Sequence, residues 1–191
     1  MNYALKLITA PAEEPIALAT ARLHLKASTT TEDALITAWI IAAREQAEQF
    51  IGRAIITQTW EMSLDAFGCA EIDIPQPPLQ SVTSVKYFDE AGVEQTLSSA
   101  LYHVDARSPL GRIVLDDTAS WPTTDVRPNA VNIRFVCGYG LTAAVPASIK
   151  QAMLLMLTDM EQHRGEVVTG TFVKIPHGVE ALLSPYRIHR F

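Results

Sequence analysis

Residues 29–60, TTTEDALITAWIIAAREQAEQFIGRAIITQTW, combine the pattern of an amphipathic helix with that of a strand that follows it directly. Thr30 or Thr31 can accept the first free N–H groups of such a helix. Asp33 adds negative charge at its positive end. Gly52 is expected to provide a left-handed C-terminal cap. Apolar residues at helical spacing predict one buried stripe: Ile36, Trp39, Ile40, Ala43, Ala47 and Phe50.

The periodicity changes after the glycine. Trp60, Met62 and Leu64 alternate with polar residues, which indicates a half-buried strand. The polar residues of the helix lie largely off its apolar stripe: Arg44, Glu45, Glu48 and Gln49.

The remaining chain predicts helices on both sides of a block of short strands. Pro15 suits the first turn of a short helix, and Pro146 opens a second long helix that Gly165 is expected to close. Grouped strands favour an α+β fold: N-terminal and C-terminal helices packed together, an inserted, mainly antiparallel block, and an extended C-terminal tail. We expect a single domain over residues 1–191, with helices at 16–52, the β-rich block at 58–137, the second long helix at 146–164 and the tail at 178–191.

Composition reduces the number of possible classes of function. Fifteen basic against twenty-one acidic residues give a net charge of −6, which argues against tight binding to nucleic-acid phosphates. The first fifteen residues lack the pattern of a secretory signal, and no apolar run is long enough to span a bilayer, so no membrane partner is expected.

Residues that carry chemistry are scattered. Cys69 and Cys137 are expected to be free, buried thiols, and the five histidines have no metal-ligand spacing. Asp116 and Asp117 are typical of a solvated turn. Phosphate-binding, dinucleotide-binding and serine-hydrolase motifs are missing, so we predict neither a cofactor nor an enzyme, although catalytic groups can be dispersed without a motif.

Two features favour contact with other proteins. The chain ends in aromatic, apolar and basic residues that are common interface anchors, although a frayed terminus is the alternative: Tyr186, Arg187, Ile188, His189, Arg190 and Phe191. The helix at 146–164 is apolar around much of its circumference, which fits either a core position or a subunit interface. Candidates for such an interface or for the core are Trp39, Met153, Met156 and Met160.

Seven segments, in order, resemble the head–tail connector (adaptor, or head-completion) proteins of long-tailed bacteriophages, a family that also occurs in prophages and gene transfer agents. Each segment alone is moderately specific, but together they span nearly the whole chain. They are Asp33-Ala-Leu-Ile-x5-Ala-Ala-Arg-Glu-x-Ala-Glu48, Gly52-Arg-Ala-x-Ile-Thr-Gln-Thr-Trp60, Pro77-Pro-Leu-Gln-Ser-Val-x-Ser-Val-Lys-Tyr87, Pro128-Asn-Ala-Val131, Phe135-x-x-Gly-Tyr-Gly140, Val145-Pro-x-x-Ile-Lys-Gln-Ala152 and Gly178-Val-Glu-Ala-Leu-Leu-x-Pro-Tyr-Arg187.

The resemblance implies a structural protein without catalytic residues, located at the head–tail junction of a phage or phage-like particle and assembled in the bacterial cytoplasm. Such connectors form a ring, a dodecamer in the family, under the capsid portal. The ring continues the channel through which double-stranded DNA passes without sequence readout, and it presents a surface to a tail-side connector or terminator protein. In the family the C-terminal segment reaches into the portal, which would assign residues 186–191 to that contact. A tail-side completion protein, a module that grips packaged DNA and a small hydrolase are the alternatives.

Overall fold

The computed structural model describes residues 3–164 and 177–188. Contacts within the chain divide it into two compact units, which are described separately below. Residues 1–12 and 57–139 form the β unit, and residues 13–56 and 140–191 form the helical unit. The chain therefore passes between the units three times, at 12–13, 56–57 and 139–140. The elements are those of an α+β fold, as predicted; the prediction of a single domain stays a prediction.

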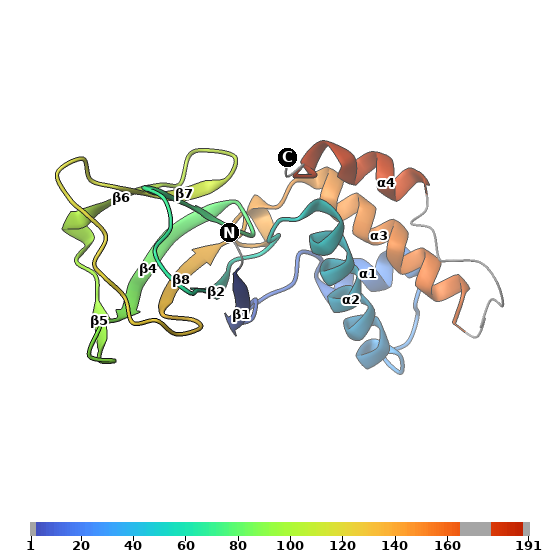
Figure 1. Ribbon diagram of the computed structural model, residues 1–191. Helices are drawn as coiled ribbons and strands as arrows, with labels where there is room; N and C mark the ends of the chain where they lie inside the picture. Colours follow the sequence, from blue (N-terminus) through green and yellow to red (C-terminus); the bar gives the residue numbers. More distant parts are fainter. Residues whose placement is uncertain (1–2, 165–176, 189–191) are drawn as a thin grey trace, which may run out of the picture. The chain divides into compact units, whose positions relative to one another are not determined.

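The β unit contains two antiparallel sheets (Figure 1). The larger has the order β1-β2-β8-β4-β5, formed by Ala4–Thr9, Gln58–Leu64, Val131–Cys137, Leu79–Phe88 and Glu94–Thr96. The smaller has the order β3-β7-β6, formed by Glu71–Ile74, Gly111–Leu115 and Tyr102–Asp105. All pairs are antiparallel, so the predicted antiparallel block is confirmed.

Alternation along the strands determines which face is buried. In β8, Val131, Ile133 and Phe135 are fully buried, whereas Arg134 on the opposite face is half-buried. Arg134 lies opposite Glu61 of β2, and the guanidinium donates to the carboxylate across 2.7 Å. One face of the larger sheet thus carries the core, and the other carries paired polar side chains.

Strands β7 and β4, from different sheets, approach closely at Gly111. A Cβ atom added to this glycine would lie 2.3 Å from Cβ of Leu79, far inside van der Waals contact. Leu79 is itself buried, and the clash is with the root of its side chain, which no change of rotamer can remove. Only glycine fits at this position without a backbone shift.

The substitution Gly111→Ala is expected to destabilise the protein by roughly 1–3 kcal/mol, because an overpacked core forces a backbone displacement. Denaturant unfolding monitored by circular dichroism measures the effect. Gly178→Ala is the matched control, since a Cβ there meets Leu155 at an ordinary 3.7 Å. Equal stability of the two variants would contradict the close approach.

The α-helices in the described part of the helical unit are α1 (Leu18–Leu25), α2 (Asp33–Ile51), α3 (Ala147–Gln162) and α4 (His177–Leu183) (Figure 1). Helix α3 contacts each of the other three, so the N-terminal and C-terminal helices pack together as predicted. Their core consists of aliphatic residues and methionines at helical spacing: Ile36, Ile40, Ala43, Ala47, Ile149, Ala152, Met153, Met156, Leu157, Val179 and Leu183.

The predicted cap at the C-terminal end of α2 is correct, and the predicted cap at its N-terminal end is wrong. Gly52 has a φ of 69° and donates its N–H to Glu48, as expected of a left-handed cap. The predicted threonine cap is wrong: Glu32 occupies the cap position, and no side chain accepts a hydrogen bond there. The carbonyl of Thr30 instead accepts from the N–H of Asp33, so backbone turn geometry replaces side-chain capping. Gly165, the predicted end of the second long helix, lies outside the described residues.

Candidate functional site

Arg44 forms several ion pairs and hydrogen bonds within the helical unit. The helical pattern had placed this residue off the buried stripe. Its side chain is only 8% exposed. Its Nε donates to Glu14 and its Nη1 to Glu48, both across 2.9 Å. Glu14 precedes α1, so the buried guanidinium joins two segments that are thirty positions apart.

The electrostatics keep this side chain charged. Burial alone would lower the pKa of Arg44, but the carboxylates of Glu48 and Glu14 outweigh it and raise the pKa above the ordinary value. A buried cation needs such partners, because its desolvation is otherwise too costly.

Further hydrogen bonds extend the network to the points where the chain leaves the helical unit. Glu48 also accepts the N–H of Ile55 across 2.8 Å, just after α2 ends. The carbonyl of Glu14 accepts the hydroxyl of Thr142 across 2.8 Å, and the carboxylate of Glu13 accepts the N–H of Thr142. The bond from the Thr142 amide lowers the pKa of Glu13. We call Glu13, Glu14, Arg44, Glu48 and Thr142 the Arg44 cluster; all five residues belong to the helical unit.

The Arg44 cluster suits structural support better than catalysis. The carboxylates of Glu14 and Glu48 are paired with the guanidinium, and Glu13 is held by a backbone amide. Across residues 3–164 and 177–188, no group of three or more His, Cys, Asp or Glu side chains could hold a metal ion. Within the same ranges, no helix has the length and apolar character needed to cross a bilayer.

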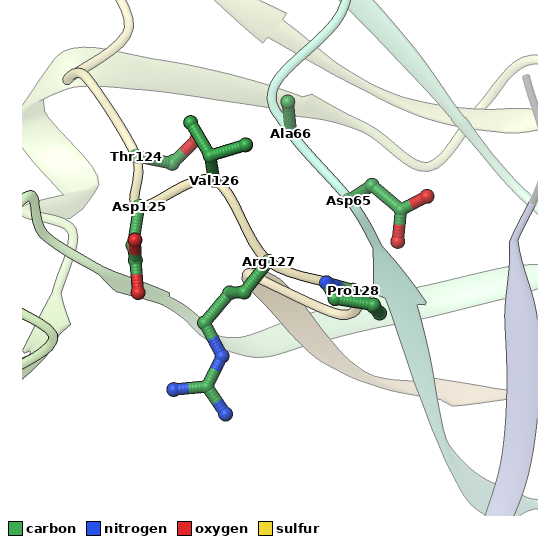
Figure 2. Close-up of a pocket in the computed structure, with 7 residues that line it drawn as sticks. All are labelled: Asp65, Ala66, Thr124, Asp125, Val126, Arg127 and Pro128. Atoms are coloured by element: carbon green, nitrogen blue, oxygen red, sulfur yellow. The ribbon is translucent and has the colours of Figure 1, made fainter.

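A surface hollow of about 360 Å³ in the β unit is lined by Asp65, Ala66 and residues 124–128 (Figure 2). Two of its three charged side chains, Arg127 and Asp65, are already engaged. The guanidinium of Arg127 stacks 4.1 Å from the ring of Phe88, and Asp65 accepts the N–H of Asn129 across 2.9 Å. Figure 2 shows the charged ends of Asp65 and Arg127 pointing in different directions. This arrangement offers no convergent set of catalytic groups.

The described part of the C-terminal tail is docked on the end of α2. Arg53 Nε donates to the carbonyl of Tyr186 across 2.6 Å, and the N–H of Ile188 donates to the carbonyl of Ile51 across 2.9 Å. The guanidinium of Arg187 lies 5.2 Å from the ring centre of Phe50. Tyr186 ends a short 3₁₀ helix, Ser184–Tyr186, after which Arg187 is extended. His189, Arg190 and Phe191 lie outside the described residues.

The candidates for interface or core occupy different environments. Met153 and Met156 are 0% and 3% exposed and belong to the core of the helical unit. Met160 and Trp39 are half-buried. The Trp39 ring has the guanidinium of Arg164 4.8 Å from its centre, and Arg164 also pairs with Glu32.

The comparisons with known proteins identify the family. A family model described as head completion protein matches residues 16–189. The chain belongs to the head completion protein family. The head–tail connector resemblance seen in the sequence is thereby confirmed. No curated protein matches the sequence.

Solved structures of gene transfer agent particles contain similar chains. A chain in the neck of an empty particle, determined with C6 symmetry, is 26% identical with a TM-score of 0.83, over 98% of this chain and 97% of that one. A chain in the neck of a native particle with C12 symmetry is 26% identical with a TM-score of 0.79. The match covers 98% of this chain and 97% of that one. A chain in the virion of a native particle shares the fold at 24% identity and a TM-score of 0.79, over 98% and 96%.

Two predictions about single residues are wrong in this head completion protein. Cys69 is exposed, whereas Cys137 is buried as expected. Arg44, placed off the stripe, is buried because its partners come from Glu14 and from its own helix. The spacing of Arg44 and Glu48, four residues apart, was the only local signal of the cluster. No local signal pointed to Glu14.

Arg44→Ala is expected to destabilise the protein by roughly 3–5 kcal/mol, because two carboxylates lose the cation that compensates them in a largely buried site. Arg134→Ala is the control: it removes an ion pair of similar length, 2.7 Å, whose arginine is 43% exposed, and should cost about 0–1 kcal/mol. Chemical denaturation of both variants checks the difference. A small loss for Arg44→Ala would show that the Arg44 cluster does not hold the unit together.

Proposed function

We propose that this protein is a head–tail connector subunit that forms a ring under the capsid portal, extends the DNA channel and joins the capsid to the tail. The observation that carries the proposal is the family match over residues 16–189, together with a fold shared along 98% of the chain with neck chains of gene transfer agent particles. The family is structural, and the Arg44 cluster has a structural arrangement in keeping with it.

The net charge of the chain favours a ring that lets DNA pass over one that binds DNA tightly. The chain carries a net charge of −6, so each added subunit increases the negative charge of the assembly. Phosphates slide past neutral or negative walls and adhere to basic ones. This favours a conducting ring over a DNA-binding module.

The C-terminal segment, Tyr186 to Phe191, is the proposed contact with the portal. Three interactions hold residues 186–188 against the C-terminal end of α2, which gives the segment a fixed point of departure. Arg187 is exposed and positioned for a partner surface. The following basic and aromatic residues are of the types that anchor interfaces.

Two truncated variants test this contact. One ends at Pro185 and lacks the whole segment; the other ends at Ile188 and keeps the interactions with α2. Each is mixed with the portal ring of the same particle, and co-migration is measured by size exclusion with light scattering. We expect the full chain to bind, the Pro185 variant to lose binding and the Ile188 variant to bind at least tenfold more weakly.

Thermal unfolding of the unbound variants separates binding from folding. The variant that ends at Ile188 should have the same thermal unfolding midpoint as the full chain, because it keeps the residues that dock on α2. Full binding by both variants would reject the tail as the portal contact. Failure of the full chain to bind the portal would reject the portal-side role and favour a tail-side completion protein.

A further inference from the structure

Helix α2 has a second apolar face, opposite the one that enters the core. Its first half exposes Leu35 at 42% and Ile41 at 37%. Between and beside them lie Ala34, Ala38 and Ala42, all exposed and spaced four apart on one side of the helix. We call these five residues the α2 outer face. A surface helix normally presents polar groups on this side, and α2 does so only from Glu45 onward.

Helix α1 also presents an apolar surface away from its core side. Its buried residue is Ala21, and the opposite side exposes Ala19, Thr20 and Leu23. Leu23 is 81% exposed, which makes it a protruding apolar side chain on a well-formed helix. We call these three residues the α1 outer face.

We propose that the α2 outer face binds the α1 outer face of a neighbouring copy of this chain, and that this contact, repeated, closes the ring. The inference rests on the proposed connector function. A ring joined head to tail needs two different, complementary faces on each subunit. The two outer faces meet that requirement within one unit. The small alanine side chains of α2 permit close approach of a second helix, and the protruding side chain of Leu23 can pack against them.

Charge at the ends of the two faces supports the same pairing. Lys26 follows Leu23 by three positions, is exposed, and forms no ion pair within residues 3–164 and 177–188. Glu45 follows Ala42 by three positions and is 63% exposed; its carboxylate forms a long ion pair with Nη2 of Arg44, 3.6 Å away, which leaves its outer side open to a second cation. When Leu23 packs beside Ala38 and Ala42 with the helices parallel, the ammonium of Lys26 approaches the carboxylate of Glu45. This charge complementarity selects a second copy as the occupant.

Other occupants fit the α2 outer face less well. Duplex DNA requires basic side chains, and the face has none. Similar chains are found in necks computed with C6 and C12 symmetry, in which rotation relates the copies of a chain to one another. The buried methionines Met153 and Met156 are used inside the unit and are not free for a neighbour.

Single substitutions on the α2 outer face test the contact without disturbing the core. Ala38→Glu places a charge at its centre, at an exposed position that accepts the longer side chain in the isolated subunit. Val126→Glu is the control, because Val126 is fully exposed in the β unit and outside both outer faces. Mass is measured by light scattering for each protein alone and bound to the portal ring. We expect the control to form rings like the unmodified chain and Ala38→Glu to lose the ring while keeping its thermal unfolding midpoint.

Charge exchange and cross-linking then identify the pairing. Lys26→Glu and Glu45→Lys should each weaken ring formation at least tenfold, and the double variant should restore it. In a Cys69→Ser background, Leu23→Cys with Ala38→Cys should give a ladder of disulfide-linked multimers under oxidation. The buried Cys137 stays in place.

The outcomes separate this inference from the proposed function. Rings of normal mass in Ala38→Glu, a double variant that fails to recover, or cross-links confined to single chains would each overturn the pairing and leave the connector role intact. If the unmodified chain forms no ring either alone or on the portal, the ring itself is rejected and the pairing with it.

Discussion

The helical unit depends on the compensation of one buried positive charge. Arg44 projects inward from α2, and its guanidinium is out of water, so carboxylates have to accompany it. One comes from the next turn of the same helix, at Glu48, and the other from Glu14, before the first helix begins. Because neither carboxylate can be withdrawn without leaving a buried charge, the two segments are fixed to each other.

That constraint has a consequence at the unit boundary. Glu48 uses its second oxygen to hold the amide of Ile55, and the segment 13–14 holds Thr142 through one carboxylate and one carbonyl. These bonds hold the residues of the helical unit that precede or follow each chain crossing: residues 13–14, Ile55 and Thr142. All these bonds lie within the helical unit, so they fix its segments to one another, and charge-assisted bonds to a buried guanidinium hold them more firmly than isolated surface pairs would.

The features that could be predicted well from the sequence are those encoded locally. The period of α2, its glycine cap and the alternation of β8 are visible over a few residues, and the structure contains each of them. Features that depend on distant partners could not be predicted in this way. Arg44 is buried through Glu14, and Cys69 is exposed although free cysteines are usually buried. The pairing of β1 with β2 joins residues at least fifty positions apart, and the N-terminal sequence indicated only an extended segment.

The α2 outer face shows a different limit. Hydrophobic periodicity identifies the stripe that enters the core, and residues outside it are assigned to solvent by default. Leu35, Ile41 and the alanines beside them are outside the core stripe and yet apolar, so the second half of the helix is amphipathic and its first half is apolar on both sides. A single core explains only one side. In the proposed ring, the other side of α2 is where we expect the sequence to encode assembly. The difference in burial within the single chain distinguishes the two sides.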